Sequence, residues 1–178
     1  MDARFQELWD HHEIRQLLMT YCRGCDRSDL IEMSSVYCEV SWDDHGRNKC
    51  DGRTYAKISI EEGKQETTVV SHQLGQSVIK VDKHYAGAET YFIATVLYLD
   101  GNGVETLNQL GGRFVDTLER EDGQWRIKKR TVVREWSYTQ PIESDWLANA
   151  GFVPARRGQR DVSYATLGLT HSGVPAHP

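Results

Sequence analysis

A carboxylate near the end of the first apolar segment could take part in acid–base chemistry. Asp26 follows Cys22 by four residues and Leu18 by eight, so a helix that continues this far projects Asp26 toward the core. A carboxylate buried without a hydrogen-bonding partner is strongly unfavourable or becomes protonated. We therefore expect a polar group to face Asp26. Alternatively, Asp26 is the N-cap residue of the next helix.

His72 is a natural partner for this carboxylate. It opens a predicted strand and shares one mostly apolar face with Val70, Leu74 and Val78. A carboxylate that holds a neutral imidazole fixes its tautomer, which is the arrangement that a general base needs. The alternative is a packed or hydrogen-bonded core histidine that has no part in catalysis.

Arg134 is the third candidate, because its strand position predicts large apolar neighbours. Alternation places it in one row with Val132, Trp136, Tyr138, Arg130 and Arg126. A guanidinium in such a row is unfavourable unless it meets an anion, a ligand oxygen or a carboxylate. The alternative is a structural ion pair with Asp26 or Asp44.

Two aromatic residues could complete a pocket. Tyr21 lies on the same helical stripe as Cys22, and its hydroxyl must find a partner if it is buried. Trp42 could supply a flat pocket wall. Either ring could instead be an ordinary core residue.

Metal and nucleotide sites are not predicted. Cys22 and Cys25 have the CxxC spacing, but they lie on a helical stripe and no second ligand pair accompanies them. His12-Glu13 does not begin a HExxH zinc motif, because position 16 is Gln. The sequence has no GxSxG motif, phosphate loop or GxGxxG motif. We therefore expect neither a metal nor a cofactor.

The elements that must position these residues begin with helices. From Phe5 to Cys25, apolar residues recur every three or four positions, which predicts a helix of more than five turns. A shorter helix over residues 30–36 completes a hairpin. A strand over residues 39–42 and a third helix over residues 55–66 are expected to follow.

Four long strands are predicted next, because β-branched and aromatic residues fill residues 69–81, 86–99, 104–119 and 125–138. Hairpin turns at residues 100–103 and 121–124 make neighbouring strands antiparallel. Gly111-Gly112 suggests a bulge or bend in the sheet. Helices followed by a strand meander indicate an α+β fold in which a curved sheet wraps a helical layer, and its concave face can hold a small molecule.

Charge and composition exclude several partners. The chain has 21 Lys and Arg against 26 Asp and Glu, a net charge of -5, which does not favour a nucleic-acid partner. The longest apolar run spans nine residues, 91–99, so we expect no membrane-spanning segment. The N-terminus does not resemble a signal peptide, and we expect a cytoplasmic protein with four reduced cysteines.

The last part of the chain, residues 141–178, looks irregular. One short helix is expected at residues 144–150. The arginines at positions 156, 157 and 160 are expected to form a solvated or inter-subunit ion-pair surface.

Several motifs together resemble one family. They are Glu13-Ile14-Arg15-Gln16-Leu17-Leu18, Tyr21-Cys22-Arg23-Gly24-Cys25-Asp26, Trp42-Asp43-Asp44-His45-Gly46, His72 at a strand start and Asp122-Gly123-Gln124-Trp125. Their order and spacing over residues 5–140 resemble a SnoaL-like, polyketide-cyclase-type domain of the nuclear transport factor two-like superfamily. The resemblance implies a cone-shaped α+β barrel over residues 1–140, with its pocket between curved sheet and helices. Residues 141–178 would be an extension on the barrel or on a neighbouring subunit.

The resemblance also implies site residues. Members of this superfamily include scytalone dehydratase, lindane dehydrochlorinase, bile-acid dehydratase and diarylpropane lyase, and others only bind ligands. Carried over to this chain, their catalytic groups fall on His72, Asp26, Arg134 and Tyr21. Contacts to substrate are expected from Trp42, His45, Asn108, Arg130 and Trp136.

These expectations favour a cofactor-independent lyase that acts on a small apolar aromatic or alicyclic substrate, such as a lignin-derived diarylpropane diol. His72 would remove a proton, Asp26 would fix its tautomer, and Arg134 and Tyr21 would stabilise negative charge on oxygen. Dehydration and retro-aldol loss of formaldehyde both fit. An isomerase or cyclase and a non-catalytic binding domain are the rivals. An apolar convex face, together with the resemblance, predicts a homotrimer, with a dimer as the alternative.

Overall fold

The computed structural model describes residues 2–63, 69–142 and 149–169. Helix α1 spans Ala3–Arg27 and ends at Ser28, whose backbone is left-handed at φ 53°. Helix α2 spans Leu30–Ser35, and the Asp29 side chain caps it by accepting from the Glu32 N–H. The helical hairpin expected from the sequence is therefore present. The alternative cap at Asp26 is wrong, because Asp29 provides the cap.

The segment between the helical hairpin and the long strands is more regular than expected. Strand β1 spans Tyr37–His45 and β2 spans Asn48–Cys50. Helix α3 spans Gly52–Glu62 and begins at the Asp51 cap. It starts earlier than expected, because Asp51 accepts from the Thr54 N–H and fixes the first turn. Residues 64–66 of the expected helix lie outside the described residues.

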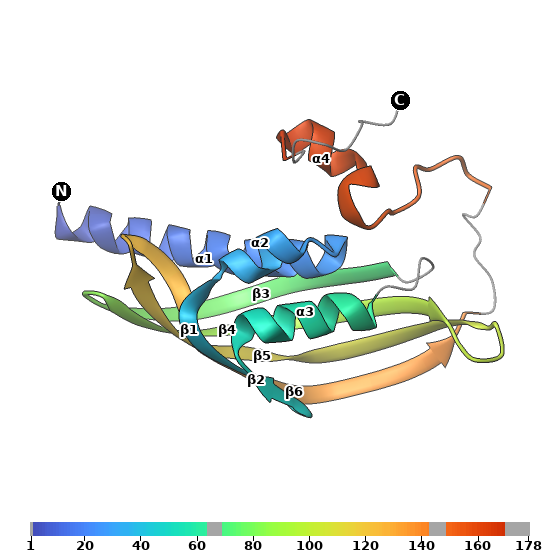
Figure 1. Ribbon diagram of the computed structural model, residues 1–178, viewed down its shortest axis with the longest axis horizontal. Helices are drawn as coiled ribbons and strands as arrows, with labels where there is room; N and C mark the ends of the chain where they lie inside the picture. Colours follow the sequence, from blue (N-terminus) through green and yellow to red (C-terminus); the bar gives the residue numbers. More distant parts are fainter. Residues whose placement is uncertain (1, 64–68, 143–148, 170–178) are drawn as a thin grey trace.

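The four long strands form the sheet as expected. They are β3 (Val69–Asp82), β4 (Tyr85–Leu99), β5 (Glu105–Glu121) and β6 (Gln124–Pro141). The sheet order is β2-β1-β6-β5-β4-β3, and β1 joins β6 in parallel. All other strand pairs are antiparallel. The sheet is curved and unclosed, and α1, α2 and α3 lie along one face of it (Figure 1).

Irregularities in the ladder change which side chains share a face, and one of them, between Thr117 and Leu118, puts an extra residue of β6 between Ile127 and Lys129. The register shifts between Gly111 and Gly112, where Gly112 pairs with Arg134 and Gly111 with Trp136, so β6 holds one extra residue. Another shift between Leu74 and Ser77 leaves Val78 57% exposed, although the sequence predicted it on the apolar face with His72. Strict alternation therefore fails beyond each bulge.

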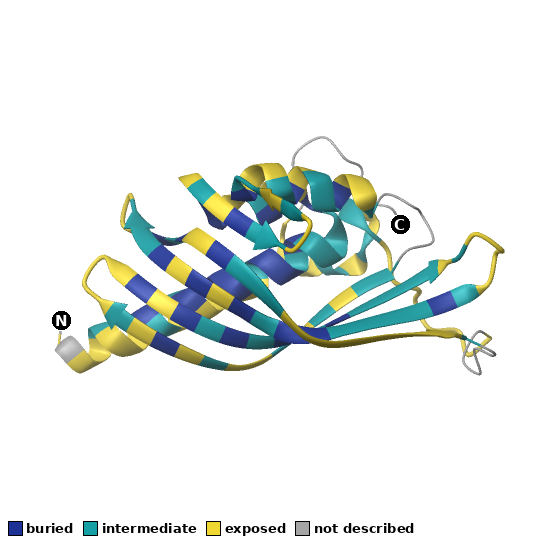
Figure 2. Cartoon of the chain, turned by 90° about the horizontal axis from the view of Figure 1, so that it is seen from below, coloured by how far each residue is buried: buried dark blue, intermediate teal, exposed yellow. Residues whose placement is uncertain are grey.

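The core lies between α1 and the sheet. Ile14, Leu18 and Tyr21 from α1 meet sheet residues such as Phe114 and Leu118, and all five are almost fully buried. Buried positions alternate along the strands beneath α1, whereas the far end of the sheet is mostly intermediate or exposed (Figure 2). No described helix is long and apolar enough to span a membrane.

The described part of the C-terminal extension folds against the helices of the same chain. A 3-10 turn (Gly158–Arg160) leads into α4 (Val162–Leu167), which the sequence did not predict. The helix expected at residues 144–150 lies largely outside the described residues. Tyr164 is buried and donates to Asp29 Oδ2 at 2.8 Å, which joins α4 to the start of α2.

Arg157 corrects the expectation of a solvated arginine cluster. Its guanidinium donates to Gly63 O at 2.7 Å and to Cys25 O at 3.1 Å, and burial lowers its pKa. It therefore joins the extension to the ends of α1 and α3, next to Asp26. Such carbonyl contacts suit a cation, because helix C-termini carry partial negative charge.

Candidate functional site

Asp26 and His72 form a hydrogen-bonded pair where the end of α1 meets the start of β3. Asp26 Oδ1 lies 2.6 Å from His72 Nδ1, and Oδ2 accepts the His72 backbone N–H at 3.0 Å. Both side chains are largely buried, with 13% and 11% exposed. Because both carboxylate oxygens are used, the imidazole is fixed in position with Nδ1 toward Asp26.

The remaining nitrogen of His72, Nε2, has no protein partner among the hydrogen bonds of the described residues. With Nδ1 as the N–H donor to Asp26, Nε2 presents a lone pair, which is what a general base requires. The pair borders a cleft of about 340 Å³ that is lined by Met19, Cys22, Arg23, Asp26, Arg27, His72 and Leu74. This volume is in the range of small-molecule sites.

A second histidine–carboxylate pair lies on β1. Asp43 Oδ1 contacts His45 Nδ1, and Asp43 Oδ2 accepts from the Tyr37 hydroxyl at 2.6 Å. His45 Nε2 lies 3.3 Å from the Tyr21 hydroxyl, and the His45 ring stacks on Tyr55 at 3.8 Å. Burial lowers the pKa of His45, although Asp43 opposes this shift. The neutral form of His45 is therefore favoured at neutral pH.

Arg130 is the buried arginine of β6. It donates from Nε and Nη2 to the two oxygens of Asp116, both at 2.8 Å, and neither side chain is exposed. Burial acts against its charge, but Asp116 raises the pKa of Arg130 above its usual value. The guanidinium carbon lies 4.2 Å from the Tyr21 ring centre and 4.1 Å from that of Phe114. Its Nη1 is buried and has no partner in the described part of the chain.

Aromatic rings connect the two histidine pairs. Phe92 and Phe114 stack with ring centres 4.2 Å apart. Phe92 lies 6.3 Å from the His72 ring, and Tyr21 meets Phe114 edge-on at 5.6 Å. The two pairs thus lie near opposite edges of the sheet, on β3 and β1, and the aromatic rings of Phe92, Phe114 and Tyr21 lie between them.

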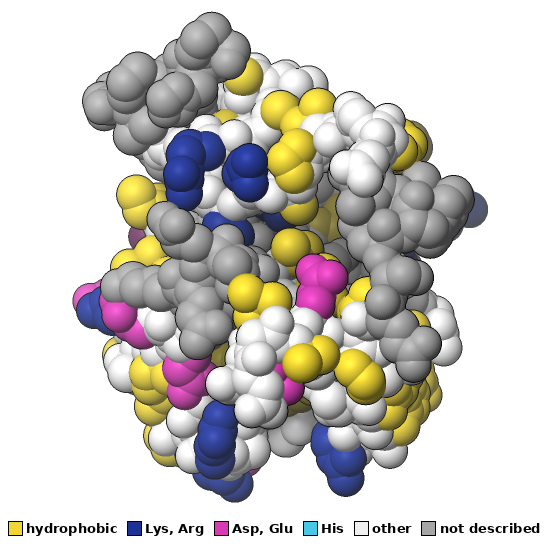
Figure 3. All heavy atoms as spheres, turned by 90° about the vertical axis from the view of Figure 1, so that its right-hand side faces the viewer, with side chains coloured by type: hydrophobic (Ala, Val, Ile, Leu, Met, Phe, Trp, Pro, Cys, Tyr) yellow, Lys and Arg dark blue, Asp and Glu magenta, His cyan; other side chains and the backbone are white. Residues whose placement is uncertain are grey.

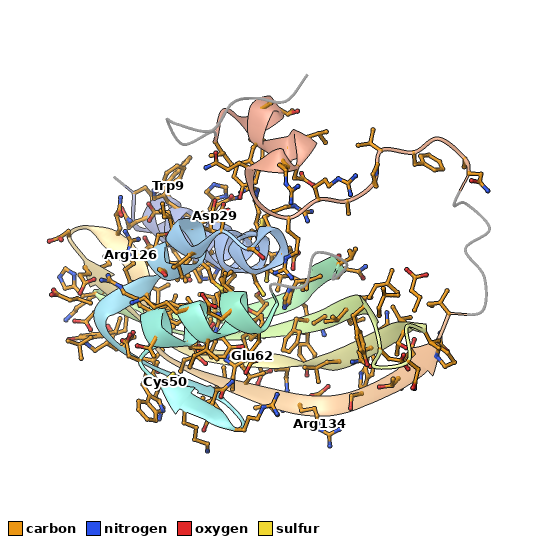
Figure 4. All side chains as sticks on the ribbon, turned by 45° about the vertical axis from the view of Figure 1, so that its right-hand side comes forward. Trp9, Asp29, Cys50, Glu62, Arg126 and Arg134 are labelled. Atoms are coloured by element: carbon orange, nitrogen blue, oxygen red, sulfur yellow. The ribbon has the colours of Figure 1, made fainter. Side chains whose placement is uncertain are left out.

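Arg134 does not join this site. It is exposed, its guanidinium donates to Ser137 Oγ at 3.1 Å, and Figure 4 shows it beyond β6 on the side away from the helices. The register is unbroken from Arg130, opposite Asp116, to Arg134, opposite Gly112, so these two residues keep the expected row, and the bulge after Arg134 separates it from Trp136. The two arginines differ in burial, because Arg130 is fully buried and Arg134 is exposed. The alternative ion pairs for Arg134 are wrong, since Asp26 pairs with His72 and Asp44 with Lys49.

The other expected contact residues lie apart from the histidine pairs. Trp42 is 45% exposed and alternates with the fully buried Asp43, which corrects the expectation of a pocket wall. Trp136 is 41% exposed and stacks on Tyr138. Asn108 accepts from Thr139 near the far end of the sheet. Figure 3 looks at that end, where hydrophobic side chains lie among charged and polar ones.

Within residues 2–63, 69–142 and 149–169, one group could hold a metal ion: the ligand atoms of Cys25, Asp26 and His72 lie within 4.8 Å of one another. Burial raises the pKa of the Cys25 thiol to about 11, which opposes the thiolate that zinc requires. Cys25 Sγ also contacts Ser59 Oγ at 3.7 Å, and His72 Nδ1 already binds Asp26. These donors fit an acid–base pair better than a metal centre.

Residues 6–131 match the model of the SnoaL-like domain family. The chain belongs to this family. The resemblance inferred from the motifs is therefore confirmed, and the α+β layers agree with the cone-shaped fold that it implied. A search of curated proteins finds no significant match.

Solved structures show the same fold. A scytalone dehydratase-like protein from Novosphingobium aromaticivorans has a TM-score of 0.67 at 19% identity, covering 88% of this chain and 97% of its own. A hexachlorocyclohexane dehydrochlorinase, LinA Type2, has a TM-score of 0.69 at 15% identity, covering 84% and 100%. The Kfla4162 protein from Kribbella flavida has a TM-score of 0.66 at 14% identity, covering 74% and 95%.

Sequence reasoning missed Asp43, Tyr37 and Asp116. Asp43 and His45 are two residues apart on a strand, so alternation places both on one face and could have predicted a carboxylate–histidine pair. Asp116 alternates with Phe114 and Leu118, which likewise predicts an inward carboxylate opposite a strand arginine. Tyr37 gives no comparable signal, because the hydrogen bond of its hydroxyl depends on the path of β1.

Proposed function

We propose that this protein is a cofactor-independent lyase that removes a proton from a small, largely apolar substrate and expels a leaving group. The observation that carries the proposal is the Asp26–His72 pair, in which a largely buried carboxylate holds Nδ1, Nε2 has no hydrogen-bond partner among the described residues, and both residues line a cleft. General-base catalysis by such a group contributes about 10²- to 10⁴-fold. Dehydration and dehydrochlorination by proteins of this fold support the assignment.

Each group has a definite task in this mechanism. His72 Nε2 takes the proton, and Asp26 stabilises the imidazolium that forms. Arg130, in place of Arg134, is the cation that we assign to this mechanism, because its Nη1 is buried and unused within the described residues; it does not line the cleft at His72 and lies beyond the stacked rings of Phe92 and Phe114. A preorganised donor of this kind stabilises charge that develops on a substrate oxygen by about 10²- to 10³-fold. The proton on His72 then passes to the leaving group.

A substrate panel with product masses tests this proposal. The full chain is incubated with aryl diols, hydroxylated rings and chlorinated rings, and products are measured by mass spectrometry. Loss of water, formaldehyde or hydrogen chloride supports a lyase, and the lost mass identifies its class. Conversion at unchanged mass would instead show an isomerase or cyclase. Binding without any conversion would contradict catalysis.

The assembly is also a proposal. Val78, Val115 and Trp136 are exposed large apolar residues of the long strands, at 57%, 39% and 41%. Covering such residues favours association, and we retain the homotrimer with a dimer as the alternative. Light scattering after size-exclusion chromatography distinguishes these states from a monomer.

A further inference from the structure

Two buried side chains that contact each other have unused hydrogen-bonding capacity, since the Arg130 guanidinium carbon lies 4.2 Å from the centre of the Tyr21 ring. Arg130 Nη1 is a donor without a partner in the described part of the chain. Among the described residues, the Tyr21 hydroxyl has one hydrogen-bond partner, His45 Nε2, so its oxygen can make a further bond. Both residues are at least 98% buried, because their exposures are 0% and 2%. An unmatched buried donor is unfavourable, so this place suits a group that can both accept and donate.

The direction of the protons follows from the second histidine pair. Asp43 accepts from Tyr37 and, as a carboxylate, also accepts the proton on His45 Nδ1. Since burial lowers the pKa of His45, the neutral ring leaves Nε2 as an acceptor. The Tyr21 hydroxyl must then donate to Nε2. Toward a ligand, Tyr21 consequently offers lone pairs rather than a proton, which differs from the oxyanion donor expected from the sequence.

We propose that Tyr21 and Arg130 bind a hydroxyl group of the substrate, and that His45 and Asp43 form a proton relay behind Tyr21. The ligand hydroxyl donates to the Tyr21 oxygen and accepts from Arg130 Nη1, which satisfies both unused groups. The substrate class is therefore a hydroxylated ring, with phenols as the best match because a phenolic O–H donates a proton more readily than an alcohol. This inference rests on the proposed lyase and adds its substrate class.

The relay is balanced as a proton transfer. The ligand O–H bond breaks and its electron pair stays on the ligand oxygen, while the proton passes to the Tyr21 oxygen. The original Tyr21 proton passes to His45 Nε2, which gives an imidazolium held by Asp43. Arg130 faces the resulting oxyanion. The reverse transfers restore the hydroxyl after the leaving group has departed. His45 acts through Tyr21 and is therefore a positioning and relay residue.

The test uses 4-nitrophenol and its methyl ether, 4-nitroanisole, as probes of the full chain. We expect saturable binding of the phenol at neutral pH, about tenfold or more tighter than that of the ether, since the ether leaves Tyr21 without a donor. We also expect the absorbance of the bound phenol to shift toward that of the phenolate. In nitrogen-15 spectra, His45 Nε2 should become protonated when the phenol binds.

Matched variants separate the relay from general packing. Tyr21→Phe keeps the ring against Phe114 and Arg130 but removes the oxygen, so the preference for the phenol should disappear. His45→Gln should abolish the phenolate shift, and exposed His84→Gln should change neither readout. If a variant fails to fold, the nitrogen-15 measurement on the unsubstituted chain decides. Equal affinity for both probes, no saturable binding, or an unchanged His45 would overturn the proposal.

The two proposals can fail separately. His72→Gln should lose turnover of any substrate from the panel while keeping the preference for 4-nitrophenol over 4-nitroanisole. A chain that turns over substrates but treats the two probes alike would refute only the hydroxyl site. A chain that prefers the phenol but converts nothing would refute the lyase and leave the hydroxyl site standing.

Discussion

Replacing Asp26 by Asn should reverse the tautomer of His72. The His72 backbone N–H, 3.0 Å from Oδ2, is always a donor, so the Asn oxygen must occupy that position. The Asn amino group then takes the place of Oδ1, 2.6 Å from Nδ1, where it can only donate. Nδ1 must become an acceptor, and the ring proton moves to Nε2. The base would then carry a proton at the atom that must accept one.

The expected loss follows from this reversal. Turnover should fall about 10²- to 10⁴-fold, the full contribution of a general base. The free energy of unfolding should fall by about 1–3 kcal/mol, because a buried hydrogen bond to a charged group is replaced by a neutral one. Chemical denaturation measures the second quantity, and nitrogen-15 spectra of the histidines read the tautomer directly.

Asp29→Asn is the matched control. It makes the same chemical change three residues later, at a cap where Asn is as effective as Asp. The Tyr164 hydroxyl, which donates to Asp29 Oδ2, can turn to accept from the Asn amino group. The His72 tautomer and turnover should both be unchanged in this variant. An Asp26→Asn protein that keeps the proton on Nδ1, or keeps its turnover, would refute the reasoning.

Three further predictions concern stability. Arg130→Met should lower the free energy of unfolding, measured in urea, by about 3–5 kcal/mol, because it leaves Asp116 buried without its partner. The double variant Asp116→Leu/Arg130→Met removes both charges and should lose less stability. A smaller loss in the single variant than in the double variant would contradict this. Arg157→Met should make the C-terminal extension more susceptible to limited proteolysis than Arg156→Met does, since Arg157 and not Arg156 binds the carbonyls of Cys25 and Gly63. Equal cleavage of the two variants would show that these bonds do not hold the extension in place. The folded-state pKa of His45 lies below its usual value of 6.5, so its stabilising contribution is present above pH 6.5 and is lost as pH falls. In His45→Gln, the free energy of unfolding should therefore fall less steeply below pH 6.5 than in the unsubstituted chain. Parallel plots of unfolding free energy against pH for the two proteins would contradict this.

Much of the fold could be predicted because its signals are local. The stripe from Ile14 to Cys25 predicts α1, and the turns at residues 100–103 and 121–124 predict the hairpins. The three-residue strand β2 and the six-residue helix α4 have patterns too short to separate from loops. Their stability comes from tertiary contacts such as that of Tyr164 with Asp29.

The candidate site could be predicted only in part. The sequence pattern predicted that Asp26 lies on the core-facing side of the first helix and His72 on the apolar face of its strand. Their contact depends on how α1 packs on β3, which no local pattern contains. The error at Arg134 has a different cause. Arg134 keeps the alternation of Arg130, but Arg130 lies opposite the buried carboxylate of Asp116, whereas Arg134 lies opposite Gly112. Which residue faces an arginine depends on the partner strand, and no local pattern contains that.

The most direct test of the acid–base account compares His72→Gln with His84→Gln on whichever panel compound the unsubstituted chain converts. Initial rates are measured at saturating substrate, with both variants shown to be folded by circular dichroism. The account predicts a loss of about 100-fold or more for His72→Gln and an unchanged rate for His84→Gln. Equal rates in both variants would contradict it.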